Sequence, residues 1–174
     1  MAHRSADTCW STPSRFMMLK VSGLVLTSLG SLLIMSSTAQ AQLMSRLTVE
    51  VMGLRGQEGN FCFKLFNGSR GFPNDNDSAV KRGCVPIADH LPETPDEPFS
   101  YAFDDLEFGT YAVAIYHDSN RDEQLNRGAF GMPSEGYGFS NDAPAETGPP
   151  NYADAVILVA GSNPTIQIQM RYPQ

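Results

Sequence analysis

The feature that most constrains the fold of this chain is a period-two alternation of apolar residues in short segments. Residues 110–116 (T-Y-A-V-A-I-Y) and 165–172 (T-I-Q-I-Q-M-R-Y) show it best. Successive side chains of a β-strand point to opposite faces, so this pattern directs one apolar face of each segment toward a core. No window of useful length shows the 3.6-residue period of an amphipathic helix. The pattern therefore predicts an all-β chain.

Further segments share the composition of strands, with β-branched and aromatic residues between turn signals. They are residues 46–52, 61–66, 81–87, 99–103 and 153–159. The sequence contains no internal repeat that would indicate a solenoid or a second domain. Seven short strands separated by turns predict a single seven-stranded Greek-key sandwich of two sheets, Ig-like in architecture.

One connection interrupts the regular spacing of these strands. Residues 117–152 hold no convincing strand and are rich in Gly, Asn, Asp, Ser and Pro. A connection of this length is uncommon in a compact domain and is usually either functional or disordered. Its aromatic residues Phe130, Tyr137, Phe139 and Tyr152 favour order, because disordered linkers contain few aromatics. We therefore expect one long ordered loop that carries the function of the protein.

The first 41 residues have the layout of a secretory signal peptide. A lysine precedes an apolar stretch at residues 21–35, and small residues follow up to the A-Q-A at residues 39–41. This order predicts cleavage after Ala41 and a protein exported to the periplasm or the cell exterior. The alternative is a membrane anchor, but the apolar stretch is shorter than the roughly 20 residues that a span needs. Met17 offers a second start, which would make residues 1–16 a mis-assigned beginning.

Residues 42–174, the expected mature domain, are acidic. The whole chain has a formal net charge of −7, and residues 1–41 contain more basic than acidic side chains. An acidic surface repels phosphate backbones and anionic lipid headgroups. We therefore expect no nucleic-acid partner and no membrane insertion after signal cleavage. An unknown protein, a sugar or a small molecule is left as the expected partner.

Two cysteines, Cys62 and Cys84, fall within the expected mature domain. An even number of cysteines in an exported protein predicts a disulfide. In the chain-entropy model, a loop of this size contributes on the order of 3 kcal/mol to stability. The alternative is a pair of separate buried thiols.

Side-chain oxygens recur at alternate positions where the long loop begins. They belong to Asp118, Asn120, Asp122, Gln124 and Asn126. Alternate residues of a tight loop can converge on one point, and the D-x-N-x-D beginning matches the first ligand positions of an EF-hand loop. The pattern departs from an EF-hand at Glu123, where the glycine of the sharp turn would stand, and at Ala129, where a bidentate glutamate would stand. We favour an Asx-rich turn whose side chains cap their own backbone. A calcium site formed by these five residues is the alternative.

His117 stands at the end of the strongest predicted strand, next to Asp118. An imidazole in this position could act as a general base or a metal ligand, so a small exported hydrolase using His117 with Asp118 or Glu135 is one alternative function. The other interpretation has the ring hydrogen-bonded to the long loop. The sequence contains no HExxH, CxxC or G-x-S-x-G motif. We therefore expect a non-catalytic binding or structural module rather than an enzyme.

The most distinctive motif of the chain lies at residues 130–141 (F-G-M-P-S-E-G-Y-G-F-S-N). If exposed, Phe130, Tyr137 and Phe139 would stack on a sugar ring or an apolar ligand, which makes a carrier of a hydrophobic or sugar ligand the other alternative function. If folded down, they would form a lid over one edge of the sandwich. We favour the lid, because exposed aromatic patches are rare on soluble monomers.

A family resemblance rests on three segments. They are residues 106–126, the F-G-M-P-S-E-G-Y-G-F-S-N-D motif at 130–142, which contains Pro133 and Glu135, and N-Y-A-D-A at 151–155. Together they resemble the bacterial exported family catalogued as domain of unknown function 2141. The resemblance implies a transthyretin-like or prealbumin-like sandwich, and it implies no activity, because none is established for the family. At Glu123 and Asn126 the family often has glycine and aspartate, so both residues weaken the calcium interpretation for this chain.

Overall fold

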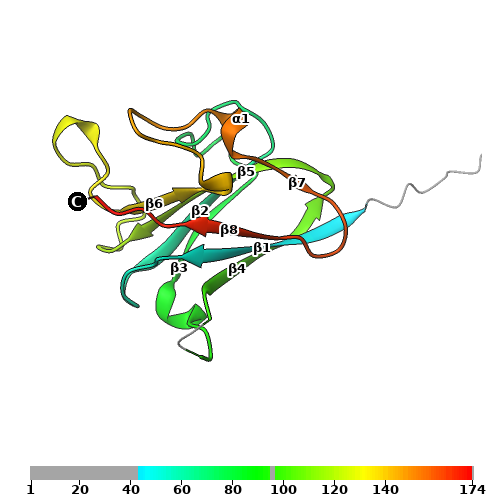
Figure 1. Cartoon of the computed structure of the whole chain (residues 1–174), viewed down its shortest axis with the longest axis horizontal. Coiled ribbons are helices and arrows are strands. Elements are labelled where there is room, and N and C mark those ends of the chain that lie inside the picture. Colours follow the sequence, from blue (N-terminus) through cyan, green and yellow to red (C-terminus); the bar gives the residue numbers. More distant parts are fainter. Residues whose placement is uncertain (1–42, 95–96, 174) are drawn as a thin grey trace, which may run out of the picture. The chain divides into compact units, whose positions relative to one another are not determined.

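The computed structural model describes residues 43–94 and 97–173, so the predicted signal peptide and start site lie outside the described residues. The strands are β1 (Met44–Met52), β2 (Asn60–Phe66), β3 (Lys81–Pro86), β4 (Phe99–Glu107), β5 (Gly109–Asp118), β6 (Gly136–Phe139), β7 (Val156–Val159) and β8 (Thr165–Gln169) (Figure 1). Short helical turns η1 (Ile87–His90), η2 (Ala129–Gly131), η3 (Ser140–Asp142) and α1 (Tyr152–Ala155) connect them. No helix in this part of the chain is long and apolar enough to cross a membrane. The all-β class is confirmed, with eight strands in place of the predicted seven.

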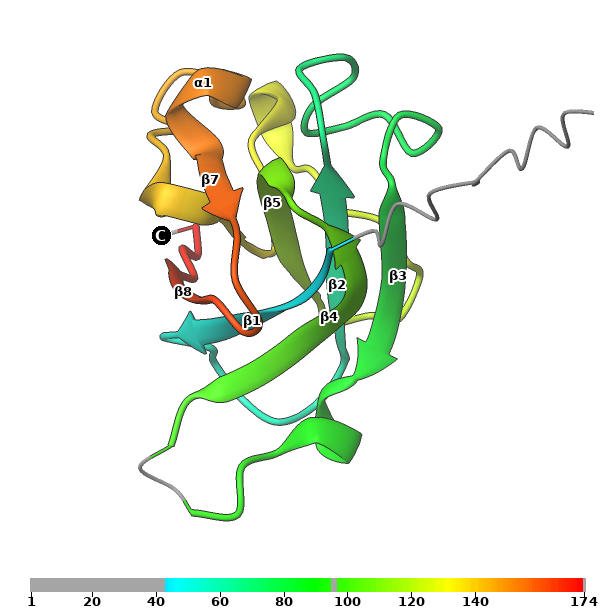
Figure 2. The same ribbon diagram turned by 90° about the vertical axis from the view of Figure 1, so that its right-hand side faces the viewer.

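The strands form two sheets. The smaller sheet has the order β4-β1-β8, with β1 antiparallel to β4 and parallel to β8. The larger sheet has the order β3-β2-β5-β6, and β7 pairs with β5 beside β6. Thus β5 has β2 along one side, while β6 and β7 share its other side. Figure 2 shows β1 and β4 crossing in front of the larger sheet.

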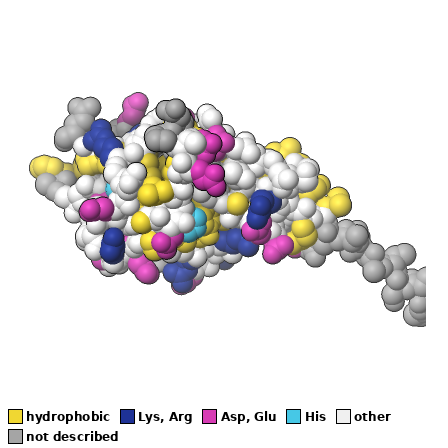
Figure 3. Space-filling model, turned by 90° about the horizontal axis from the view of Figure 1, so that it is seen from below, with side chains coloured by type: hydrophobic (Ala, Val, Ile, Leu, Met, Phe, Trp, Pro, Cys, Tyr) yellow, Lys and Arg dark blue, Asp and Glu magenta, His cyan; other side chains and the backbone are white. Residues whose placement is uncertain are grey.

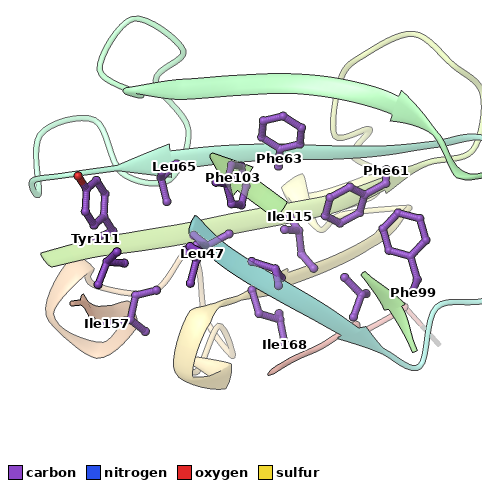
Figure 4. Packing of buried hydrophobic residues seen from close by; sticks show 14 of the residues in the cluster. Leu47, Phe61, Phe63, Leu65, Phe99, Phe103, Tyr111, Ile115, Ile157 and Ile168 are labelled. Atoms are coloured by element: carbon purple, nitrogen blue, oxygen red, sulfur yellow. The ribbon is translucent and has the colours of Figure 1, made fainter. Parts of the chain in front are cut away.

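Alternate residues of the strands face one another between the two sheets (Figure 4). The fully buried members on β1 and β2 include Leu47, Val49, Phe61 and Leu65. Phe61 of β2 meets Phe99 of β4 with a ring-centroid separation of 4.9 Å. The predicted period of two therefore correctly indicates which residues lie inside. It also places the intervening residues of β2 and β5 on the opposite side of the larger sheet, which we call the outer face.

The outer face is partly covered by the segment predicted as the long loop. Ala112 and Ala114 of β5 are buried there against Phe139, while Tyr137 and Tyr152 pack against this cluster. The segment also contributes β6 and α1 to the fold.

Strand β6 is missing from the prediction because two of its four residues are glycines, which are depleted in strands. The structure explains both glycines by close packing on the inner side of β6. A Cβ atom on Gly136 would collide with the ring of Tyr172, and one on Gly138 would lie 2.8 Å from Cγ2 of Ile168. The glycines therefore allow the C-terminal segment to approach this strand.

The predicted disulfide between Cys62 and Cys84 is confirmed, with an S–S distance of 1.97 Å. The two residues are direct partners in the ladder between β2 and β3, and their Cα atoms are 4.0 Å apart. Strand β3 is an edge strand with half-buried and exposed side chains. The bond therefore links the edge of the larger sheet covalently to its interior.

Candidate functional site

The carboxylate of Asp118, the last residue of β5, is fully buried on the outer face. Its Oδ1 accepts a hydrogen bond from the backbone N–H of Asp122 at 3.1 Å. Its Oδ2 accepts from the N–H of Glu123 at 3.0 Å and from Nδ2 of Asn60 at 3.1 Å. A buried carboxylate is costly unless such donors satisfy it. The chain consequently turns around this side chain as it leaves the sheet.

Asp122 organises the next part of the turn. Its Oδ1 accepts from the N–H of Gln124 at 3.0 Å. Its Oδ2 accepts from Nδ2 of Asn120 and of Asn126, at 3.0 and 3.1 Å. The structure therefore brings together the side chains of three of the five predicted calcium ligands, Asn120, Asp122 and Asn126. Asp118 joins them through the backbone N–H of Asp122, and Gln124 joins them through its own backbone N–H. The carboxylate oxygens accept from N–H donors of the protein, which is the arrangement of an Asx-rich turn.

The backbone makes the sharp turn of this segment without a glycine. Glu123 has a φ of 60° and Arg121 a φ of 63°, both in the left-handed region. The hydroxyl of Tyr116 donates to the carbonyl of Glu123 at 2.7 Å. Burial, with help from nearby carboxylates of which Asp118 acts most strongly, raises the pKa of Tyr116 to about 12. Tyr116 therefore keeps its proton, and this hydrogen bond, to a higher pH than an ordinary tyrosine would.

Glu135 closes the turn from the start of β6. Its side chain is buried, and its Oε1 accepts from the N–H and the hydroxyl of Ser119 at 2.9 and 3.0 Å. Its Oε2 accepts from the N–H of Asn126 at 3.0 Å. Two buried carboxylates thus hold residues 118–126, because Asp118 accepts from N–H groups in the middle of the segment and Glu135 from groups near both of its ends. We call this segment the Asp118 turn.

Among the described residues, Cys62, Cys84 and Asp118 bring potential metal-ligand atoms within 4.8 Å of one another. Both sulfur atoms belong to the disulfide, so neither is a thiolate that could bind a metal. This group is distinct from the predicted calcium ligands of the Asp118 turn. Calcium binding at those ligands stays a prediction.

His117 lies on the opposite side of the sheet from Asp118. Its ring is 7 % exposed, its Nε2–H donates to the carbonyl of Glu58 at 2.9 Å, and its Nδ1 accepts from the hydroxyl of Tyr172 at 2.8 Å. The Tyr172 hydroxyl also accepts from the N–H of Arg55 at 2.9 Å. Because neighbouring strand residues point to opposite faces, the structure does not bring His117 and Asp118 together. Both ring nitrogens connect the end of β5 to other segments of the chain.

The turn η3, which follows β6, has a structural role that the period-two sequence pattern does not predict. The buried hydroxyl of Ser140 accepts from the N–H of Val113 at 2.9 Å and donates to the carbonyl of Ala155. Nδ2 of Asn141 donates to the carbonyl of Val156 at 2.7 Å. Oδ1 of Asp142 accepts from the N–H of Gln169 at 2.7 Å. A hydroxyl, an amide and a carboxylate directly after a strand are a turn signal that could have indicated this role.

A cavity of about 190 Å³ opens on the outer face. Its floor contains Lys64 of β2, Ala114 of β5 and Phe139 of β6, which are direct partners across the three strands. The next row along the sheet is Cys62, Tyr116 and Tyr137. Ala114 is small and stands between larger side chains, so the surface is hollow at its position. We call this space the outer cavity.

Two segments form the walls of the outer cavity. Residues 125–133 turn back on themselves, with the N–H of Gly128 donating to the carbonyl of Met132 at 2.8 Å, and residues 145–149 lie on another side. Pro133 is half-buried in the first wall. Phe130 also lines the cavity, although this residue is fully exposed to solvent.

The three predicted aromatic residues therefore have different environments. Phe139 is buried and Tyr137 is half-buried, as a lid packed on the sandwich requires, while Phe130 is exposed at the mouth of the cavity.

Lys64 is a cavity residue that the sequence analysis missed. Its Nζ donates to the carbonyl of Asn74 at 2.9 Å. Burial lowers the pKa of Lys64, and the positive charge of Arg82, its partner on β3, lowers this pKa further. A lysine inside the apolar run F-C-F-K-L-F was the available signal.

Comparisons with known proteins give one family and no closer relative. The family model described as "Uncharacterized protein conserved in bacteria (DUF2141)" matches residues 49–167. No curated protein and no solved structure matches the chain. The transthyretin-like detail of the predicted fold therefore stays a prediction.

The left-handed conformation of Glu123 gives a testable prediction for stability. A non-glycine residue in this region costs about 1–2 kcal/mol, and glycine adds an entropic cost of roughly 0.5–1 kcal/mol on folding. Glu123→Gly should therefore raise the free energy of unfolding by about 0.5–1 kcal/mol in urea denaturation. Gln124→Gly is the matched control, because this exposed neighbour has no positive φ, and it should destabilise the protein. Equal destabilisation by the two variants would contradict a conformational cost at Glu123.

Proposed function

The chain belongs to the uncharacterised bacterial family DUF2141, and we propose that it is an exported, non-catalytic β-sandwich module that binds a small ligand in the outer cavity. The proposal joins two of the predicted functions, a binding module and a carrier of a hydrophobic or sugar ligand. The cavity is the observation that carries it.

The size and lining of the outer cavity suit a small molecule with an apolar face. Tyr137, Met132 and Pro133 offer aromatic and aliphatic surface, and Phe130 stands exposed at the mouth. An apolar protein cavity of about 150 Å³ is large enough for benzene. The outer cavity, at about 190 Å³, therefore suits a single ring or a chain of similar size. Aromatic side chains favour the flat faces of rings, including the apolar faces of sugars.

Three observations support a non-catalytic role. Both nitrogens of His117 are engaged in hydrogen bonds within the protein. The hydroxyl of Ser140 is buried and bonded to backbone groups. Cys62 is held in the disulfide. A nucleophile and its general base need to lie within hydrogen-bond reach of each other, and these three residues use their polar atoms structurally.

Export is supported by the predicted signal peptide and by the disulfide. Disulfides persist in the periplasm and outside the cell, whereas they are rare in the reducing cytosol. The Cys62–Cys84 bond is compatible with such a compartment.

Filling the floor of the outer cavity tests the proposed binding. Ala114→Leu places a larger side chain where the cavity is hollow, and it should abolish the NMR shifts that 3-phenylpropan-1-ol causes at Tyr137 and Met132 in the wild-type protein. Ala88→Leu makes the same change at an exposed position outside the cavity lining and should leave binding intact. Methyl β-glucoside, titrated in parallel, distinguishes a sugar ligand from an apolar one. The proposal fails if neither compound binds, or if Ala114→Leu binds as the wild type does.

Calcium binding in the Asp118 turn is a second proposal, favoured by one observation. Glu123 occupies the position of the EF-hand glycine and adopts a left-handed φ of 60°, so the sharp turn of such a loop is present. The carboxylate oxygens accept hydrogen bonds from the protein, so the cation would compete with these donors. We expect an affinity no better than the roughly 10⁻⁴–10⁻³ M of extracellular calcium modules.

Thermal unfolding tests this second proposal. At a calcium concentration ten times Kd, binding stabilises the folded state by about 1.4 kcal/mol, which should raise Tm by a few degrees. Asp122→Asn should remove this shift, because it takes away an exposed carboxylate of the turn and leaves the buried Asp118 intact. Asp154→Asn removes an exposed carboxylate outside the turn and should retain the shift. Equal shifts with magnesium and calcium, or an undiminished shift in Asp122→Asn, would exclude the site.

A further inference from the structure

The charged groups that line the outer cavity are both basic. They are Lys64 on the floor and Arg127 on the 125–133 wall, and no aspartate or glutamate is among the described residues that line it. The chain as a whole has a net charge of −7. Figure 3, which views the molecule from below relative to Figure 1, shows acidic and basic side chains interspersed on that face. The cavity is thus a local exception in an acidic protein.

Lys64 has hydrogen-bonding capacity beyond its present contact. An ammonium group has three N–H donors, and the described contact uses one of them for the carbonyl of Asn74. Among residues 43–94 and 97–173, Lys64 forms no ion pair. Asp75 exerts a favourable charge effect on Lys64, but its carboxylate accepts from the hydroxyl of Ser78 and the N–H of Asp77.

The neighbourhood of Lys64 favours an added negative charge. Arg82 stands directly opposite Lys64 in the β2–β3 ladder, and like charges at such positions destabilise a sheet. Arg127 donates from Nη1 to the carbonyl of Gly131 at 2.9 Å, and a guanidinium has five N–H donors in all. An anionic group in the cavity would receive charge-assisted hydrogen bonds from Lys64 and Arg127. Its negative charge would also offset the repulsion between Lys64 and Arg82.

We propose that the ligand of the outer cavity is a small carboxylate whose apolar body is a single ring or a short chain. The carboxylate binds Lys64 and Arg127, and the apolar body packs against Tyr137 and Met132. The cavity volume of about 190 Å³ has room for a body of roughly the size of one ring. This inference rests on the proposed function, because it names the class of ligand for the same cavity.

Three probes of equal length separate the inference from the proposed function. They are 3-phenylpropanoate, 3-phenylpropan-1-ol and 3-phenylpropylammonium, titrated into the protein by NMR at low salt. The carboxylate should bind about tenfold more tightly than the alcohol, the factor expected for a charge-assisted hydrogen bond. The ammonium compound should bind most weakly. Raising the salt concentration should weaken the carboxylate alone.

Variants of the cavity cations complete the experiment. Lys64→Met should reduce carboxylate affinity about tenfold and leave that of the alcohol unchanged. Lys81→Met removes the same charge from a residue outside the outer cavity lining and should leave both affinities unchanged. Arg127→Gln, at an exposed position, provides a second test if Lys64→Met alters the fold, and it should weaken the carboxylate selectively.

The outcomes distinguish the two claims. If none of the three probes binds, this inference is overturned, and if methyl β-glucoside also fails to bind, the proposed function is overturned as well. If the alcohol binds as tightly as the carboxylate, the cavity is a binding site but the inference is overturned. The inference is also overturned if Lys64→Met and Arg127→Gln both keep the preference of the wild-type protein for the carboxylate.

Discussion

The Asp118 turn and the cavity wall that follows it depend on a carboxylate buried at the end of β5. Asp118 terminates β5 with no exposed surface, and three N–H groups surround its oxygens. Without these donors, the desolvation of a carboxylate would oppose folding. Glu135 repeats the arrangement with donors from Ser119 and Asn126. The two carboxylates fix the path of the chain into the 125–133 segment, which then forms a wall of the outer cavity.

The period-two pattern predicted the all-β class and the inner faces of the strands, because burial between two sheets requires that alternation. It could not predict β6. The two glycines of this strand are needed because Tyr172 and Ile168 leave no room for a Cβ atom at either position. Those contacts join segments far apart in the sequence, so no local pattern records them. The disulfide could be predicted because the expected signal peptide and the even number of cysteines after it can both be read from the sequence. The strand register that aligns Cys62 with Cys84 cannot be read in this way.

The candidate site was only partly predictable for the same reason. The sequence identified Asp118 and Asp122 as candidate calcium ligands and Glu135 as a candidate partner of His117. It could not show that the carboxylate oxygens of all three accept hydrogen bonds from N–H groups of the turn. His117 and Asp118 are adjacent in sequence and yet face opposite sides of the sheet, so the strand geometry separates the two residues of the alternative catalytic pair. Lys64 acquires its position from the register of three strands. Its role in a cavity becomes visible only when that register is known.

Hydrogen exchange at the Asp118 turn tests most directly whether the buried carboxylates hold this segment. The backbone N–H groups of Asp122 and Glu123 donate to Asp118, and that of Asn126 donates to Glu135. Their exchange should be slowed to a degree approaching that of amides in the β2–β5 ladder, because opening them requires exposure of a buried carboxylate. Exchange as fast as that of the exposed residues 146–148 would contradict the account.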